Sequence, residues 1–225
     1  SLFKECINMM RVLITGTSTG IGRGTAIKFL DEGFEVIGFD IEKSTIDHAH
    51  YTHYIVDVAY QDQLPDIEPV DILICNAGVQ NSGRDIEVNL KGLMYCTEKY
   101  GIQPNIKSIL LTASVSAHNG AEFPEYCASK GGVLAYTKNV AMRVAKYGAT
   151  CNSISAGGVI TELNAHILED KKLWEEVMSV TMIPKWATVE EMADWNYFMT
   201  VTNKSMTAQD VLIDNGEISY AHFVW

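Results

Sequence analysis

A glycine-rich turn at residues 15–22, with the sequence T-G-T-S-T-G-I-G, most constrains how this chain can fold. The turn follows the apolar run Val12, Leu13 and Ile14 and leads into a helical pattern. A strand that ends at glycines and continues as a helix presents free backbone N–H groups at the positive end of the helix dipole, where a pyrophosphate can bind. The spacing G-x-x-x-G-x-G also fits an ordinary strand-to-helix turn without a ligand. If the turn is a nucleotide cradle, its cofactor contacts are Gly16, Ser18, Thr19, Gly20, Ile21 and Gly22.

The second predicted strand, residues 34–39, ends at Asp40, close to where a dinucleotide site places an acid for the ribose hydroxyls. A carboxylate at this point accepts hydrogen bonds from the 2′-OH and repels a 2′-phosphate, so Asp40 favours NAD over NADP. The next residue is Ile41 and not arginine, which leaves Lys43 and Arg23 as the nearby cations that could neutralise a 2′-phosphate. The alternative is a strand-end aspartate that caps the following turn.

Strand-like and helix-like segments alternate along the whole chain. This alternation predicts an α/β fold, a doubly wound parallel sheet (Rossmann-like) in a single domain over residues 1–225. Polar residues follow the strands, at the carboxyl edge where open α/β sheets bind ligands. The mixed segment 161–186 is interpreted as a helical substrate lid, with an ordinary packed helix as the alternative. Further strands are expected at residues 54–56, 71–75, 106–112 and 151–154, and helices at 21–32, 85–100, 124–147 and 188–201.

Charge and cysteine content exclude several classes of function. The 225 residues include 17 Lys and Arg against 28 Asp and Glu, a formal net charge of −11, which disfavours nucleic acids and anionic membrane surfaces as partners. No apolar run is long enough to span a membrane. Five cysteines without a C-x-x-C pair indicate reduced thiols and a cytoplasmic location. The histidines at 48, 50 and 53 are expected in a solvated loop, so no metal site is predicted.

Tyr126 and Lys130 lie four residues apart near the start of the long predicted helix, so their side chains share one face. An ammonium beside a phenol favours the phenolate and pulls the tyrosine pKa from about 10 toward neutral pH, as a general acid/base requires. Such a pair also occurs by chance on many helices, and by itself the spacing is weak evidence of catalysis.

Taken together, the motifs resemble those of the short-chain dehydrogenase/reductase family. The chain carries, in the order of that family, the T-G-x-x-x-G-I-G turn, Asn76-Ala77-Gly78, Ser114 and Tyr-x-x-x-Lys, and Asn89 matches a fourth catalytic position. The resemblance covers nearly the whole chain, and five ordered motifs are far more specific than any one of them.

The resemblance implies a catalytic role for Asn89, Ser114, Tyr126 and Lys130. Tyr126 would be the proton donor or acceptor, Ser114 would hold the substrate oxygen, Lys130 would lower the tyrosine pKa and bind the nicotinamide ribose, and Asn89 would support a water. Ser116 competes with Ser114, and Asn89 could instead bond only to backbone. Further cofactor contacts implied by the family are Asp57 and Val58 at the adenine, Asn76, Ala77 and Gly78 at the adenosine ribose, and Val159 and Thr161 at the carboxamide.

Three departures from the family pattern concern loops. Ala156-Gly157 replaces the usual Pro-Gly after the sixth strand, which is expected to loosen the loop at the nicotinamide. The spans 57–71 and 76–89 are short, so their helices are expected to be reduced to turns.

His118, four residues after Ser114, fits either the pocket or a loop. The apolar end 220–225 is expected to pack on a neighbouring subunit.

The leading hypothesis is an NAD(H)-dependent oxidoreductase that interconverts a secondary alcohol and a ketone by hydride transfer, with Tyr126 as general acid/base. The alternatives are an NADP-dependent ketoacyl or carbonyl reductase and a non-catalytic nucleotide-sensing protein of the same fold. The partners expected are a small-molecule alcohol or ketone and a second copy of the chain. The predicted helices at 85–100 and 124–147 are the pairing surfaces of a homodimer or homotetramer.

Overall fold

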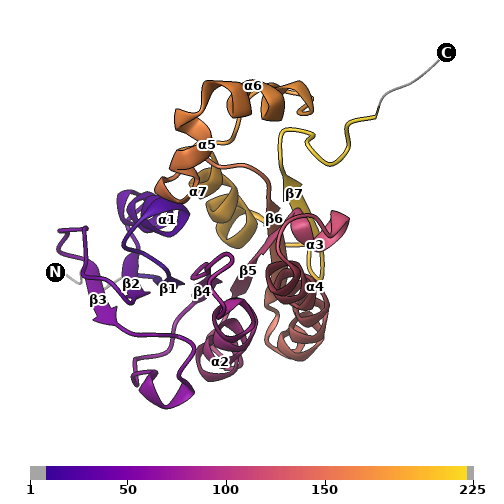
Figure 1. The fold of residues 1–225 in the computed structure, drawn as a ribbon. Helices are drawn as coiled ribbons and strands as arrows, with labels where there is room; N and C mark the ends of the chain where they lie inside the picture. Colours follow the sequence, from indigo (N-terminus) through magenta and orange to yellow (C-terminus); the bar gives the residue numbers. More distant parts are fainter. Residues whose placement is uncertain (1–8, 222–225) are drawn as a thin grey trace, which may run out of the picture.

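Seven parallel strands form one sheet in the order β3-β2-β1-β4-β5-β6-β7 in the computed structural model, which describes residues 9–221 (Figure 1). The chain runs outward from β1 to β3 and then returns to place β4 on the other side of β1. This reversal opens a crevice at the carboxyl ends of the strands, where ligands bind in folds of this kind. The strands are β1 (Arg11–Thr15), β2 (Glu35–Asp40), β3 (Tyr51–Ile55), β4 (Ile72–Cys75), β5 (Ser108–Ser114), β6 (Thr150–Ala156) and β7 (Asp210–Ile213).

Helices cover both faces of the sheet. One face packs against α1 (Gly20–Asp31) and α7 (Val189–Tyr197), and the other against α2 (Leu93–Cys96) and α4 (Pro124–Val144) (Figure 1). Strand β1 contributes side chains to both cores. Val12 and Ile14 pack on the side of α1 and α7, and Leu13 packs on the side of α2 and α4. Burial on both faces explains the continuous apolar runs of the central strands. The remaining helices and helical turns are η1 (Gln61–Gln63), η2 (Ile86–Gly92), η3 (Thr97–Gly101), α3 (Ser116–Asn119), η4 (Ala145–Tyr147), η5 (Glu162–Asn164), α5 (Ala165–Glu169), α6 (Lys171–Ser179) and η6 (Phe198–Thr202).

The structure confirms the predicted fold class and corrects individual elements. Strand β3 begins at Tyr51, three residues before the predicted start, because its polar, half-exposed residues give no apolar signal. Strand β7 was not predicted, since only its short run Val211–Ile213 is apolar. The span 57–71 contains only the three-residue 3₁₀ turn η1, as its length predicted. The capping box at Thr188 and Glu191 starts α7, also as predicted.

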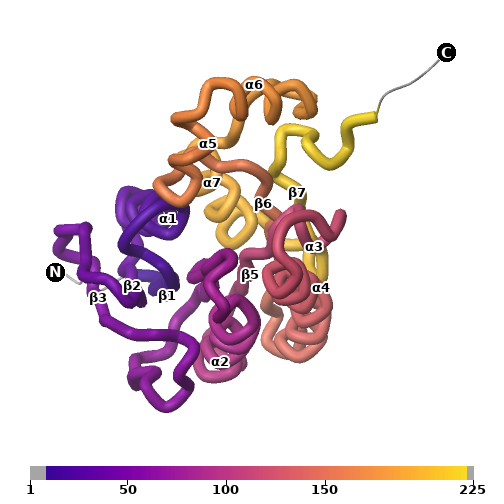
Figure 2. Tube along the Cα trace, viewed as in Figure 1, coloured from indigo at the N-terminus to yellow at the C-terminus, as the bar shows by residue number. Residues whose placement is uncertain are grey.

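Segment 161–186 forms short helices at one end of the molecule. Figure 2 shows the chain leaving β6, passing through α5 and α6 at the top of the view, away from α2 and α4, and returning to α7. None of the helices within residues 9–221 has the length and apolar character that a membrane crossing needs. Cys6 and most of the apolar end 220–225 lie outside the described residues.

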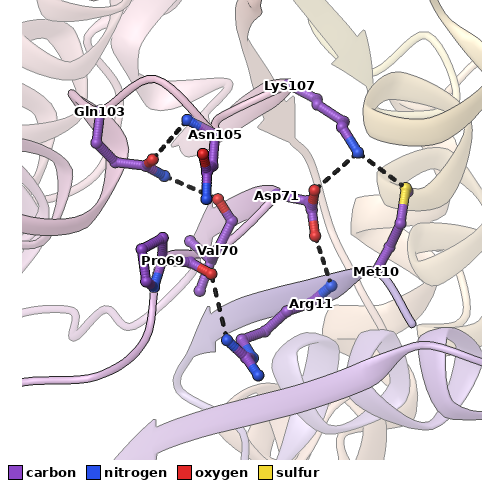
Figure 3. A network of polar contacts seen from close by, with 8 residues as sticks. All are labelled: Met10, Arg11, Pro69, Val70, Asp71, Gln103, Asn105 and Lys107. Carbon is purple, nitrogen blue, oxygen red and sulfur yellow. Dashed lines mark hydrogen bonds and ion pairs between the residues drawn. The ribbon is translucent and has the colours of Figure 1, made fainter. Parts of the chain in front are cut away.

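The amino edge of the sheet is held by a polar network around Asp71 (Figure 3). The Asp71 carboxylate accepts a hydrogen bond from the backbone N–H of Arg11 at 2.9 Å and pairs with the Lys107 ammonium at 2.7 Å. Nearby, the Gln103 amide donates to the carbonyl of Val70 at 2.8 Å. These contacts fix the starts of β1, β4 and β5 relative to one another and leave the carboxyl edge free for ligands.

Candidate active site

A cavity of about 490 Å³ runs along the carboxyl edge of the sheet. It brings together segments far apart in sequence, from the glycine turn to the loop after β7. Three predicted site residues do not line it: Ser18, Gly22 and Asn89. The predicted residues that do line it are Gly16, Thr19, Gly20, Ile21, Asp40, Asp57, Val58, Asn76, Ala77, Gly78, Ser114, Tyr126, Lys130, Val159 and Thr161.

The glycine turn is built so that α1 starts directly on the cavity wall. Gly16 and Gly20 have left-handed φ angles of +78° and +52°, which glycine adopts without strain. A Cβ on Gly22 would lie 1.9 Å from the carbonyl oxygen of Gly16, so only glycine allows the helix to sit on the turn. Thr19 precedes α1 without capping it by a side-chain hydrogen bond, which leaves the first N–H groups of the helix for a ligand. An uncapped helix start on a cavity fits the pyrophosphate of a dinucleotide.

Asp40 lies at the end of β2, and its carboxylate is oriented by two backbone N–H groups. The N–H of Ser18 donates to Oδ2 and the N–H of Glu42 donates to Oδ1, both at 2.9 Å. Ser18 therefore positions Asp40 and does not itself line the cavity. Neither Arg23 nor Lys43 is part of the cavity wall. The Arg23 guanidinium donates instead to the hydroxyl of Thr45 at 3.0 Å.

The far end of the cavity, beyond β2, contains a charge pair that the sequence analysis missed. Arg84 pairs with the Asp57 carboxylate at 2.8 Å, and both residues line the cavity beside Val58. The pairing raises the pKa of Arg84. Because the two residues lie 27 positions apart in a loop and a strand end, no local spacing could have identified the pair.

The strand end at Asn76 is tied to the glycine turn. The hydroxyl of Thr15 accepts hydrogen bonds from the backbone N–H groups of Asn76 and Ala77, both at 3.0 Å. The Asn76 amide donates to the carbonyl of Thr15 at 3.2 Å. These bonds hold the two cofactor-binding segments at the reversal point between β1 and β4.

Ser114, Tyr126 and Lys130 converge on the opposite end of the cavity. Ser114 ends β5, and Tyr126 lies in the first turn of α4, one turn before Lys130. The Lys130 ammonium lies 5.7 Å from the centre of the Tyr126 ring and donates to the carbonyl of Thr112 at 2.9 Å. A hydroxyl, a phenol and an ammonium on one wall are the groups that can bind a carbonyl oxygen and transfer a proton to it.

Burial alters the pKa of both members of the Tyr126 and Lys130 pair. It lowers the pKa of Lys130 to about 8 and raises the pKa of Tyr126, which a hydrogen bond to Ser114 partly offsets. The charges of Glu122, Asp85 and Cys127 raise the pKa of Tyr126 further. The pKa of Tyr126 in this structure is therefore raised, with burial as the largest cause, whereas the sequence analysis expected it to be lowered.

Asn89 is not part of the cavity wall, and its role in catalysis stays a prediction. Its side chain is fully buried. Oδ1 accepts from the N–H of Val79 and Nδ2 donates to the carbonyl of Val79, both at 2.8 Å, while Nδ2 also reaches the hydroxyl of Ser129 at 3.2 Å. The side chain thus fixes the loop that follows Gly78 and joins it to α4 through Ser129.

Ser116 is a supporting residue and Ser114 the pocket residue, since only Ser114 lines the cavity. The N–H of Ser116 donates to the Ser114 hydroxyl at 3.2 Å. The Ser116 hydroxyl donates to the carboxylate of Glu122 at 2.5 Å. His118 also lies outside the cavity wall and contacts Asp210 at 2.8 Å and Ser155 at 3.1 Å, so it joins α3 to β6 and β7.

The loop after β6, which carries the Ala156-Gly157 departure, pairs with the segment before α7. The N–H of Ile160 donates to the carbonyl of Ala187 at 2.9 Å, and the N–H of Ala187 donates to the carbonyl of Gly158 at 3.1 Å. Backbone pairing therefore connects this loop to the segment before α7, and the expected loosening at Ala156-Gly157 stays a prediction. Trp186 packs against Gly158 and lines the cavity, and its buried indole N–H has no hydrogen-bond partner among the described residues.

The segment 161–186 contributes apolar wall to the cavity through Leu163 and Ile167. Trp174 of α6 meets Trp186 edge to face, with ring centres 5.3 Å apart. No group of His, Cys, Asp and Glu side chains suited to a metal ion occurs in residues 9–221.

The fold and the site define a nucleotide-binding α/β protein. A hydroxyl, a phenol and an ammonium group lie together at one end of its cavity. Comparisons with known proteins agree with this class. A family model described as "Enoyl-(Acyl carrier protein) reductase" matches residues 16–217. The chain belongs to the short-chain dehydrogenase/reductase family and is an oxidoreductase of that family.

Relatives across the family differ in substrate and cofactor. The chain is 26% identical to a glucose 1-dehydrogenase of Gluconobacter oxydans, covering 98% of this chain and 96% of the relative. It is 28% identical to a 3-oxoacyl-(acyl-carrier-protein) reductase of Thermotoga maritima, covering 91% and 96%. A solved mutant 4-hydroxyisoleucine dehydrogenase with NADH and succinate has the same fold, with a TM-score of 0.85, 23% identity and coverage of 94% and 100%. The solved structure of ElxO with NADP bound has a TM-score of 0.83, 23% identity and coverage of 94% and 99%.

Proposed function

We propose that this protein is an NAD(H)-dependent oxidoreductase that interconverts a secondary alcohol and a ketone. The observation that carries the proposal is the convergence of Ser114, Tyr126 and Lys130 on the cavity that also contains the glycine turn and Asp40. The bound nicotinamide would supply the hydride acceptor or donor.

The residues of the chain divide the chemistry among them. In alcohol oxidation, the Tyr126 phenolate takes the hydroxyl proton while Ser114 holds the substrate oxygen by a hydrogen bond. In ketone reduction, the Tyr126 phenol returns that proton to the carbonyl oxygen. Lys130, which donates a hydrogen bond to Thr112, keeps a positive charge near the phenolate and would contact the nicotinamide ribose.

Asp40 supports the choice of NAD(H). A 2′-phosphate beside this carboxylate would bring like charges within a few ångströms, which costs several kcal/mol at an effective dielectric constant of about 20. Glu42 adds a second acid to the same part of the cavity wall, and the cations Arg23 and Lys43 are not part of that wall. Arg84 is paired with Asp57.

Cofactor choice is tested with one substitution. We expect kcat/KM for NADH to exceed that for NADPH by at least about a hundredfold. The variant Asp40→Ala should narrow or abolish this preference, because it removes both the repulsion and the hydroxyl contacts. Steady-state kinetics with both cofactors measure the ratio. Equal use of NADPH by the unmodified protein would contradict the proposed position of the ribose.

The second candidate is an NADP-dependent ketoacyl reductase, favoured by the similarity to the Thermotoga maritima protein. An enzyme that docks an acidic carrier protein needs a basic surface, whereas this chain has 28 acidic against 17 basic residues. A non-catalytic nucleotide sensor is the third candidate. Nicotinamide absorbance measured over a panel of alcohols and ketones separates it from the enzyme, since a sensor would bind the cofactor without turnover.

A further inference from the structure

Two carboxylates that the catalytic proposal does not use, Glu122 and Glu217, line the cavity that contains Ser114. Glu122 comes from the connection between β5 and α4, and Glu217 follows β7. Both segments lie on the β5, β6 and β7 side of the sheet, at the same end of the cavity as Tyr126. A substrate held by Ser114 and Tyr126 therefore lies beside both acids.

Glu122 is connected to Ser114 through Ser116. The Glu122 carboxylate accepts from the Ser116 hydroxyl at 2.5 Å, and that hydroxyl accepts from the Ser114 hydroxyl at 3.3 Å. Glu122 also has a left-handed φ of +75°, a backbone conformation that is strained for a residue with a Cβ. Such strain persists where the surrounding structure holds the residue in place, and it occurs often at ligand sites.

Glu217 reaches the same place from the other side. Its Oε2 lies 3.4 Å from the N–H of Gly158, two residues beyond Ala156, and the β5–β6 register pairs Ala156 with Ser114. Burial raises the pKa of Glu217, and the charges of Asp214 and Glu122 raise it further. The two acids are therefore close enough for one to sense the charge of the other.

Nothing in residues 9–221 forms an ion pair with either acid, although the acids elsewhere in the chain have several cation partners. The cations of the cavity wall are Arg84, held by Asp57 at the far end, and Lys130, held by Thr112. An anionic substituent on the substrate would meet repulsion here, and a cationic one would gain both attraction and hydrogen bonds.

The indole N–H of Trp186 is enclosed at this end of the cavity. It is a buried donor without an acceptor among the described residues, on the wall beside Gly158. Because this N–H is inaccessible and lies against Gly158, it marks tight packing of the wall and is not a ligand contact.

We propose that Glu122 and Glu217 determine substrate class: the secondary alcohol or ketone carries an ammonium group, which binds between these two carboxylates beside Tyr126. The proposal rests on the proposed function and deepens it. The ammonium also offsets the charge of Glu122 at Tyr126, so the substrate itself favours the phenolate that alcohol oxidation needs. Besides Glu122, the charged or titratable groups that act on Tyr126 are Asp85, Cys127 and Lys130.

The test uses three alcohols that differ in one substituent: 1-amino-2-propanol, 1,2-propanediol and lactate, together with their longer-chain homologues. With NAD as the cofactor, we expect kcat/KM to be highest for 1-amino-2-propanol and lowest for lactate. The value for the ammonium compound should exceed that for the diol by at least about tenfold, chiefly because its KM is lower. In the double variant Glu122→Gln with Glu217→Gln, the three alcohols should have nearly equal kcat/KM values. Glu162→Gln, which removes an acid from the lid side of the same cavity, is the matched control and should keep the order.

A pH profile separates this role from a structural one. With the neutral diol, Glu122→Gln should move the rise in activity to lower pH, because removing the negative charge lowers the pKa of Tyr126. With the ammonium compound the shift should be smaller. A higher kcat/KM for the diol or for lactate than for the ammonium compound would overturn this inference and leave the proposed function intact. So would a preference for the ammonium compound that persists in the double variant. Absence of turnover with every alcohol and every ketone would instead contradict the proposed function.

Discussion

Tyr126 requires its phenolate form for alcohol oxidation and its phenol form for ketone reduction. Because burial raises its pKa above the ordinary value of about 10, the phenol is the dominant form near neutral pH. Alcohol oxidation should therefore become faster from about pH 7 toward pH 10, and ketone reduction should stay level and then decline. The pKa of Lys130, at about 8, works against this trend, since loss of its positive charge above that pH opposes phenolate formation and broadens the rise.

Initial rates of both directions across this pH range measure the effect. Oxidation that is already at its maximum in mildly acidic solution would show that the pKa of Tyr126 is lowered in the working enzyme and that burial does not dominate.

Individual site residues differed in how far the sequence could predict them. Asp40 was assigned from its place after a strand and the Tyr126 and Lys130 pair from its shared helix face, which are local properties, whereas the role of Ser114 followed from the resemblance to the family. The hydrogen-bond partners of Asn89 at Val79 could not be predicted, because they depend on how the loop at Val79 folds back on the helix. Arg84, Trp186 and Glu217 were missed since only the folded chain brings them to the cavity.

At the scale of elements, the glycine turn and α1 act as one unit. In Gly22→Ala the new Cβ would collide with backbone at 1.9 Å, so the turn must shift, and NADH binding should weaken by about tenfold or more together with a loss of stability. Gly24→Ala is the matched control, because its Cβ would meet the Val189 side chain of α7 and not the turn. It should lower stability with little effect on NADH binding.

Fluorescence titration with NADH and urea denaturation of both variants give the two quantities. Equal loss of NADH affinity in the two variants would mean that the close contact between Gly22 and Gly16 has no special role in the cradle.

Elements with a clear period or cap were predictable, and short or polar ones were not. The long helix α4 and the capping box of α7 follow from sequence because each carries a local signal. Strand β7 is paired with β6 by tertiary packing, and its four residues lack a distinctive pattern.

At the scale of the whole molecule, we predict a homodimer or homotetramer that pairs through α4 and the helix of residues 86–101. Gly131 of α4 has open space where a Cβ would point, and Met142 is 72% exposed. A small residue and an apolar side chain exposed on one helix suit close contact with a second copy. Sedimentation velocity at micromolar concentration should show an oligomer, and Met142→Glu should weaken it. A monomer at all concentrations would contradict this assembly.

The central claim is that Tyr126 transfers the proton in a hydride-transfer reaction between nicotinamide and a secondary alcohol or ketone. The most direct measurement compares the unmodified protein with Tyr126→Phe, for NADH binding by fluorescence and for ketone-dependent NADH oxidation by absorbance. We expect the variant to bind NADH and to lose at least about a hundredfold in turnover, because its ring cannot donate a proton. Turnover that survives the substitution would contradict the account.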